Sequence, residues 1–140
     1  ANLHPGGKLG KRLMRVETLM HAGAQCPIVR LDTRMRDVIY EMSRKALGMT
    51  CVVDAQEVLQ GIITDGDLRR HMETATAILD MSAGDVMTRG PMVIPPSTLA
   101  VEALNIMEQR KITSIVVVDG EPRRVAGVVH LHDLWRTEMI

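Results

Sequence analysis

The chain has 140 residues, of which 46% are apolar, so it can bury the core of one compact domain or of two very small ones. Basic and acidic residues both number 17, and this zero net charge favours neither nucleic acid nor an anionic membrane as a partner. The sequence has no signal-peptide pattern and no apolar run long enough to span a bilayer, and its two cysteines form no CxxC pair. We therefore expect a cytoplasmic protein with two buried thiols.

The N-terminal stretch is polar and is interrupted by Pro5 and three glycines. Proline and paired glycines break regular structure, so we predict a connector over residues 1–15 that runs into a short helix near residues 9–20. His4 stands directly before Pro5 and by itself is typical of an exposed loop.

A first set of elements is expected in residues 16–80. The segment Pro27-Ile28-Val29 predicts an extended stretch, and an apolar stripe at helical spacing follows it. The side chains of Asp32 and Thr33 are placed to cap that helix, and Gly48 is placed to end it. Two strands and a second helix complete the set, at residues 50–53, 59–64 and 65–74.

The same order of elements returns in residues 81–140. Pro91-Met92-Val93 corresponds to the earlier proline segment, and Ser97 and Thr98 are placed to cap the next helix. Each half alone is too small for a secure core, so we expect the halves to pack sheet against sheet. The predicted fold class is α+β, with two repeats related by pseudo-two-fold symmetry. Two strands and a final helix are predicted in this half, at residues 114–118, 125–129 and 131–138.

One stretch occurs twice and marks the most informative part of the sequence. GIITDGDLRR, Gly61–Arg70, returns as GVVHLHDLWR, Gly127–Arg136. Each copy predicts the end of a strand that turns into a helix, with a hydroxyl or imidazole in the turn and a carboxylate three residues later. Two such turns related by a repeat indicate a two-fold binding cleft rather than a catalytic centre.

The ordered set of these features, present twice between Val16 and Arg136, resembles a tandem pair of cystathionine-β-synthase (CBS) domains, known as a Bateman module. A closer resemblance is to the C-terminal part of bacterial arabinose-5-phosphate isomerases, which supply the acidic sugar Kdo. It is carried by three motifs, LHPGGKLGKRL at Leu3–Leu13, TDGDLRR at Thr64–Arg70 and LHDL at Leu131–Leu134. In that family a sugar isomerase (SIS) domain precedes the CBS pair, so the resemblance implies that residues 1–15 are the connector from such a domain.

The resemblance to CBS pairs implies a nucleotide site between the repeats. Asp67 and Asp133 are placed to accept hydrogen bonds from ribose hydroxyls, and Thr64 and the following helix N-terminus are placed to bind a phosphate. His130 replaces the hydroxyl in the second turn, where a protonated imidazole is the group expected to bind an anion. The remaining expected contacts are charge from Arg69 and Arg70, apolar walls from Ile28, Val29, Met92 and Val93, and backbone groups around Met49, Thr50, Ser114 and Ile115.

Structural alternatives exist for the same residues. An aspartate in a first helical turn is often only a cap, which is an open reading for Asp67. His130, His132 and Asp133 do not indicate a metal site, because the two histidines alternate along the chain and are expected to point to opposite sides. No Ser/His/Asp constellation is recognisable in residues 16–140.

We therefore expect no cofactor, but an adenine or cytidine nucleotide such as AMP, ATP or a CMP-Kdo-like product as a regulatory ligand. The chain itself is expected to be non-catalytic, while its parent is expected to be an isomerase in which His4 serves the active site of the missing SIS domain. A homodimer is the expected state of this chain. The alternative is a module that only dimerises and assembles the isomerase without sensing a ligand.

Overall fold

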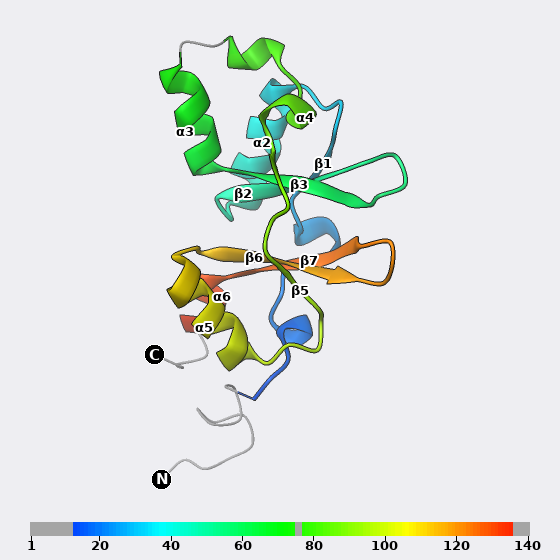
Figure 1. Cartoon of the computed structure of the whole chain (residues 1–140), viewed down its shortest axis with the longest axis vertical. Helices are drawn as coiled ribbons and strands as arrows, with labels where there is room; N and C mark the ends of the chain where they lie inside the picture. The colour runs from blue at the N-terminus through cyan, green and yellow to red at the C-terminus, as the bar shows by residue number, and fades with distance from the viewer. Residues whose placement is uncertain (1–12, 75–76, 136–140) are drawn as a thin grey trace.

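A computed structural model describes residues 13–74 and 77–135 of the chain. Two β-sheets lie face to face at its centre, and helices cover the outer face of each sheet (Figure 1). The first sheet contains β1 (Ile28–Arg30), β2 (Met49–Val53), β3 (Leu59–Thr64) and β4 (Thr88–Arg89), and the second contains β5 (Val93–Ile94), β6 (Ser114–Asp119) and β7 (Arg124–His130). The α-helices are α2 (Met35–Lys45), α3 (Asp65–Glu73), α4 (Ala83–Val86), α5 (Ala100–Arg110) and α6 (Leu131–Trp135).

Both sheets repeat one pairing pattern. β1 pairs parallel with β2 and β5 with β6, while the β2–β3 and β6–β7 pairs are antiparallel. Even a local irregularity repeats, because the register shifts between Val52 and Val53 in one sheet and between Val117 and Val118 in the other. The predicted α+β fold with two repeats and pseudo-two-fold symmetry is confirmed. The two central strands of each repeat lie within one residue of their predicted bounds.

In the part of the chain that the structure describes, the apolar side chains form three buried clusters. Two lie between a sheet and its own helices. The third lies between the two sheets, and its buried members are Cys26, Leu47, Met49, Cys51, Val116, Val118 and Val128. Since burying an aliphatic side chain contributes about 1.5–3 kcal/mol, this cluster stabilises the packing of the two halves. The expected packing of sheet against sheet is what the structure shows.

Each half completes the core of the other. Val16 is fully buried in the cluster beneath α5 and α6, although it precedes every element of the first sheet. Ala83 and Val86 of α4 are buried in the cluster beneath α2. The strand β4 likewise crosses from the second repeat to pair with β3. The equivalent segment at the start of the first repeat forms a bridge between His21 and Val128 of β7.

The prediction that side chains cap the start of α2 and α5 is wrong. It concerned Asp32 and Thr33 for α2, and Ser97 and Thr98 for α5. The hydroxyl of Thr33 instead accepts from the backbone of the preceding turn, at 2.9 Å. The first N–H of each helix is satisfied by a distant carbonyl, because Met35 donates to Met81 (3.0 Å) and Ala100 donates to Met14 (2.7 Å). Backbone carbonyls of the crossing segments therefore cap these two helices, in place of the side chains that the local sequence pattern predicted.

Two predictions about helix ends are also wrong. α2 ends before Ala46, which adopts the left-handed conformation (φ 58°), so Gly48 is not the terminating residue. In the described part of the helix predicted near residues 9–20 there is a single 3-10 turn, Val16–Thr18. The N–H of Val16 donates to the carbonyl of Thr98 at 2.8 Å, and this bond to another segment replaces a helical one.

Candidate functional site

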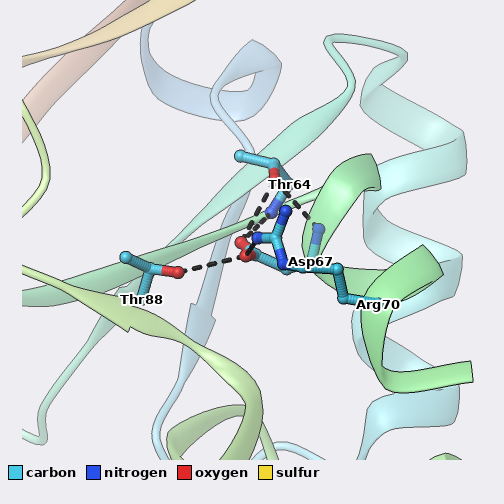
Figure 2. Close-up of polar contacts among 4 residues, drawn as sticks. All are labelled: Thr64, Asp67, Arg70 and Thr88. Atoms are coloured by element: carbon cyan, nitrogen blue, oxygen red, sulfur yellow. Dashed lines mark hydrogen bonds and ion pairs between the residues drawn. The ribbon is translucent and has the colours of Figure 1, made fainter. Parts of the chain in front are cut away.

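The first repeated turn joins β3 to α3 and holds a buried carboxylate (Figure 2). Asp67 is 5% exposed, and it accepts hydrogen bonds from the backbone N–H (2.9 Å) and the hydroxyl (3.1 Å) of Thr64. The hydroxyl of Thr64 in turn accepts from the N–H of Asp67 at 3.2 Å. Arg70 forms an ion pair with the same carboxylate, and the hydroxyl of Thr88 donates to it at 3.1 Å. Asp67 thus caps α3 and also ties β4 to the turn.

The second repeated turn joins β7 to α6 and uses different groups for the same task. Asp133 is 4% exposed and accepts from the backbone N–H of His130 at 2.8 Å. Its other oxygen lies 2.9 Å from Nε2 of His21. Nδ1 of His130 accepts from the N–H of His132 at 3.1 Å, so a neutral imidazole takes the capping role that a hydroxyl has in the first turn.

The two histidines of this turn lie next to each other. The ring centroids of His130 and His132 are 4.6 Å apart, and the prediction that they point to opposite sides is wrong. The alternation of a strand does not apply here, because His130 ends β7 and His132 lies in α6. Within residues 13–74 and 77–135, no group of three or more His, Cys, Asp or Glu side chains is arranged to hold a metal ion.

The partners of the two carboxylates are themselves equivalent. Thr88 and His21 each follow a methionine, Met87 and Met20, on the segment that crosses to the other repeat. Each segment approaches the glycine that opens the repeated motif, so the crossing strand, the glycine and the carboxylate form one unit in each half. The repeated sequence motif therefore corresponds to this structural unit, which occurs once in each half.

A cavity of about 740 Å³ lies between the halves, beside the first turn, and we call it the threonine cleft. Its volume is within the range of small-molecule sites, about 300–1,000 Å³. Five of the predicted site residues line it, namely Met49, Thr64, Met92, Ser114 and His130. The walls therefore come from both repeats, as the resemblance implied for a ligand site.

A second cavity, of about 520 Å³, lies beside the second turn, and we call it the histidine cleft. Asp133 and His130 line it, together with His21, His132 and Trp135. Leu47 and His130 line both clefts, so the two cavities adjoin. The side chains of Asp67 and Arg70 instead border a third cavity of about 330 Å³ beside β4.

The other predicted site residues border none of these three cavities. Val29 and Ile115 are buried in the clusters beneath the helices, and the hydroxyl of buried Thr50 donates to the carbonyl of Cys51 at 3.2 Å. Ile28 and Arg69 are exposed. Val93 packs against the cluster between the sheets. His4 lies outside the described residues.

The sequence reasoning missed four residues that surround the turns and clefts. Arg110 and Lys111, at the end of α5, line the threonine cleft. Thr88 and His21 hold the two turn carboxylates. Their matching positions after Met87 and Met20 are a signal in the sequence, but only the crossing of the chain brings them to the turns.

Burial lowers the pKa of His130 below its ordinary value of 6.5. The nearby His132 and His21 also lower this pKa, whereas Asp133 raises it. The unfolded chain therefore binds a proton at this residue at a higher pH than the folded chain does. We expect the free energy of unfolding to fall as the pH decreases from above 6.5 through the folded pKa, and to fall less in His130→Thr. Denaturant titrations at about pH 7.5 and 5.5 measure both differences, and equal pH dependence of the two proteins would contradict the assignment.

Cys26 and Cys51 are free and buried. The side-chain hydrogen bond with Cys51 lowers the pKa of Cys26, and the same bond together with burial raises the pKa of Cys51.

Among the described helices, none has the length and apolar character needed to cross a membrane.

Comparison with known proteins gives relatives for nearly the whole chain. It is 44% identical over 138 residues to the arabinose 5-phosphate isomerase KdsD of Yersinia pestis and 45% identical over 138 residues to that of Escherichia coli K12. The enzyme of Pseudomonas aeruginosa is 46% identical over 134 residues. These matches cover 95–98% of this chain but 41–42% of each relative, so the chain spans about two fifths of their length.

Solved structures share the fold at lower identity. CBSX2 in complex with AMP superimposes with a TM-score of 0.75 at 22% identity, over 89% of this chain and 96% of that one. The CBS domains of a transcriptional regulator from Streptococcus pneumoniae superimpose with a TM-score of 0.74 at 17% identity, over 89% and 98%. The CBS domain family model matches residues 16–74 and 83–134. The chain belongs to the CBS domain family, as a tandem pair.

Proposed function

We propose that this chain is the nucleotide-binding regulatory CBS pair of an arabinose-5-phosphate isomerase, which converts D-ribulose 5-phosphate to D-arabinose 5-phosphate in Kdo biosynthesis. The observation that carries the proposal is the 44–46% identity to such isomerases along almost the entire chain. The missing SIS domain is then its covalent partner, and His4 in the connector serves that domain. The free, buried thiols support a cytoplasmic location.

The ligand in this proposal is an adenine or cytidine nucleotide, AMP, ATP or a CMP-Kdo-like product, bound between the repeats. The threonine cleft offers a site of suitable volume with walls from both halves. A related fold, CBSX2, was solved with AMP. Asp67 and Asp133 remain the proposed ribose carboxylates. Asp133 lines the histidine cleft, whereas Asp67 borders the third cavity, so its side chain must turn for it to meet a ribose in the threonine cleft.

One observation favours the alternative, a dimerisation and assembly module without a sensory role. Both turn carboxylates are buried and already bonded within the protein, as structural caps are. In this case the chain would form a homodimer and stabilise the isomerase oligomer, while the clefts would stay empty.

Calorimetric titration of the purified chain with AMP, ATP, CMP and CMP-Kdo distinguishes these functions. We expect saturable binding of at least one nucleotide. The variants Asp67→Asn and Asp133→Asn keep the size of each side chain while removing its charge, and one of them is expected to weaken that binding. Absence of heat and of a thermal shift with every nucleotide would support the assembly module instead.

Deletion of residues 16–140 from the full-length parent tests regulation directly. Coupling between a regulatory site and an active site is typically worth about 1–3 kcal/mol, so the bound nucleotide should change the isomerisation rate several-fold in the intact enzyme only. Rates with and without nucleotide, together with light scattering, separate sensing from assembly. An unchanged rate and an unchanged nucleotide response after deletion would exclude a regulatory role.

A further inference from the structure

The two clefts present different charges at equivalent positions. Arg110 ends α5 and Lys111 follows it, and both line the threonine cleft opposite the Thr64 turn. At the corresponding positions of the internal repeat, Lys45 ends α2 and Ala46 follows it, and both line the histidine cleft. The end of α5 therefore places two cations at the threonine cleft, and the end of α2 places one at the histidine cleft.

The backbone has the same conformation at the ends of α2 and α5, so the difference in charge comes from the side chains. Lys111 and Ala46 both adopt the left-handed conformation, with φ of 56° and 58°. Each donates its N–H to the carbonyl of a methionine one turn earlier in its helix. A non-glycine residue with positive φ is uncommon, and its presence at both helix ends shows that the repeat keeps this geometry.

Lys45 is the one lysine or arginine among the described residues that line the histidine cleft, and its charge is already neutralised. Nζ of Lys45 lies 2.6 Å from a carboxylate oxygen of Glu41, and both side chains are largely buried. In residues 13–74 and 77–135, neither Arg110 nor Lys111 forms an ion pair. Their charges remain available to a ligand in the threonine cleft.

The acidic side chains strengthen this contrast. Among the residues of 13–74 and 77–135 that line the threonine cleft, Asp65 is the one acidic residue, so two cations there exceed one carboxylate. The histidine cleft is lined by Asp133 and by Lys45, whose charge Glu41 already balances. The threonine cleft has a surplus of positive charge, and the histidine cleft has none while its histidines are neutral.

We propose that the threonine cleft selects a nucleotide that carries two or more neighbouring anionic groups, bound by Arg110 and Lys111 from the opposite repeat. This inference rests on the proposed nucleotide binding and specifies the class of ligand. A nucleoside diphosphate and a nucleotide joined to a carboxylated sugar both have this chemistry. The histidine cleft does not share the preference, because its cation is already paired.

The test is calorimetric titration of the whole chain, without divalent cations, with AMP, ADP, CMP, CDP and CMP-Kdo. We expect ADP or CDP to bind about tenfold more tightly than its monophosphate, since a charge-assisted hydrogen bond supplies a difference of that size. A preference for CMP-Kdo over both CMP and CDP identifies the carboxylated sugar, and a preference for ADP or CDP identifies the diphosphate. The preference should weaken as the salt concentration rises.

Arg110→Gln and Lys111→Gln should each remove most of this preference, because each takes away a cation that lines the threonine cleft. Lys45→Gln is the matched control, because it removes one cation at the equivalent position of the other cleft and should leave the preference intact. Equal affinities for nucleotides with one and with two anionic groups, or a preference that survives both substitutions, would overturn the inference alone. Absence of binding by every nucleotide would overturn the proposed function and this inference with it.

Discussion

Alanine in place of Gly61 or Gly127 should lower the free energy of unfolding by about 3 kcal/mol, the upper part of the range for overpacking a filled core. A Cβ at Gly61 would lie 2.6 Å from the carbonyl oxygen of Thr88 and 2.8 Å from the sulfur of Met87. At Gly127 the corresponding distances are 2.8 Å to the carbonyl oxygen of His21 and 2.7 Å to the sulfur of Met20. A methionine side chain can move, but the carbonyl belongs to the segment that crosses between the halves.

Denaturant titration of the two variants measures this loss. Gly66→Ala is the matched control, because its Cβ would make only ordinary contacts, at 3.5 Å or more, in the first turn of α3. We expect that control to equal or exceed the stability of the parent protein, since alanine favours a helix over glycine. Equal stability of all three variants would show that the crossing segments are free to move away from the sheets.

Alanine in place of Asp67 should also lower the free energy of unfolding by about 3 kcal/mol. The substitution removes the cap of α3 and leaves the hydroxyl of Thr88 and the N–H of Thr64 without their acceptor. Arg70 is a smaller part of this loss, because its side chain is 68% exposed and its charge is screened by water.

Asp85→Ala is the control for Asp67→Ala. Asp85 forms the same kind of capping box with Ser82 at the start of α4, where its carboxylate accepts from the N–H at 3.1 Å and the hydroxyl at 3.0 Å. Asp85 is exposed, so its loss should cost much less than the loss of buried Asp67. Denaturant titration of both variants gives the comparison, and similar losses would mean that burial and Thr88 add nothing to the cap.

Asp67 has a structural task in addition to its proposed role towards ribose. The two can be separated, because Asp67→Asn removes the charge but keeps one oxygen that accepts from Thr64, while the amide nitrogen takes the place of the oxygen that accepts from Thr88. A variant that folds with nearly the stability of the parent and binds nucleotide more weakly would assign the carboxylate to the ligand. This is the reason to prefer asparagine over alanine in the binding experiment.

The sequence by itself determined the repeat, the central strands and the two turns. Strands β3 and β6 and the start of α3 follow from local patterns, because β-branched runs and a Thr-x-x-Asp cap act through residues close in the chain. The capping reading of Asp67, left open by the sequence, describes its contacts in this structure.

The tertiary structure alone decided how distant segments meet. The caps of α2 and α5 are carbonyls of Met81 and Met14, and the exchange of Val16 and α4 between the halves cannot be inferred from spacing. The same is true of Arg110 and Lys111, which reach the threonine cleft only because the sheets pack face to face. Local sequence specifies which face of an element is apolar, whereas the packing of the whole chain specifies which partner covers that face.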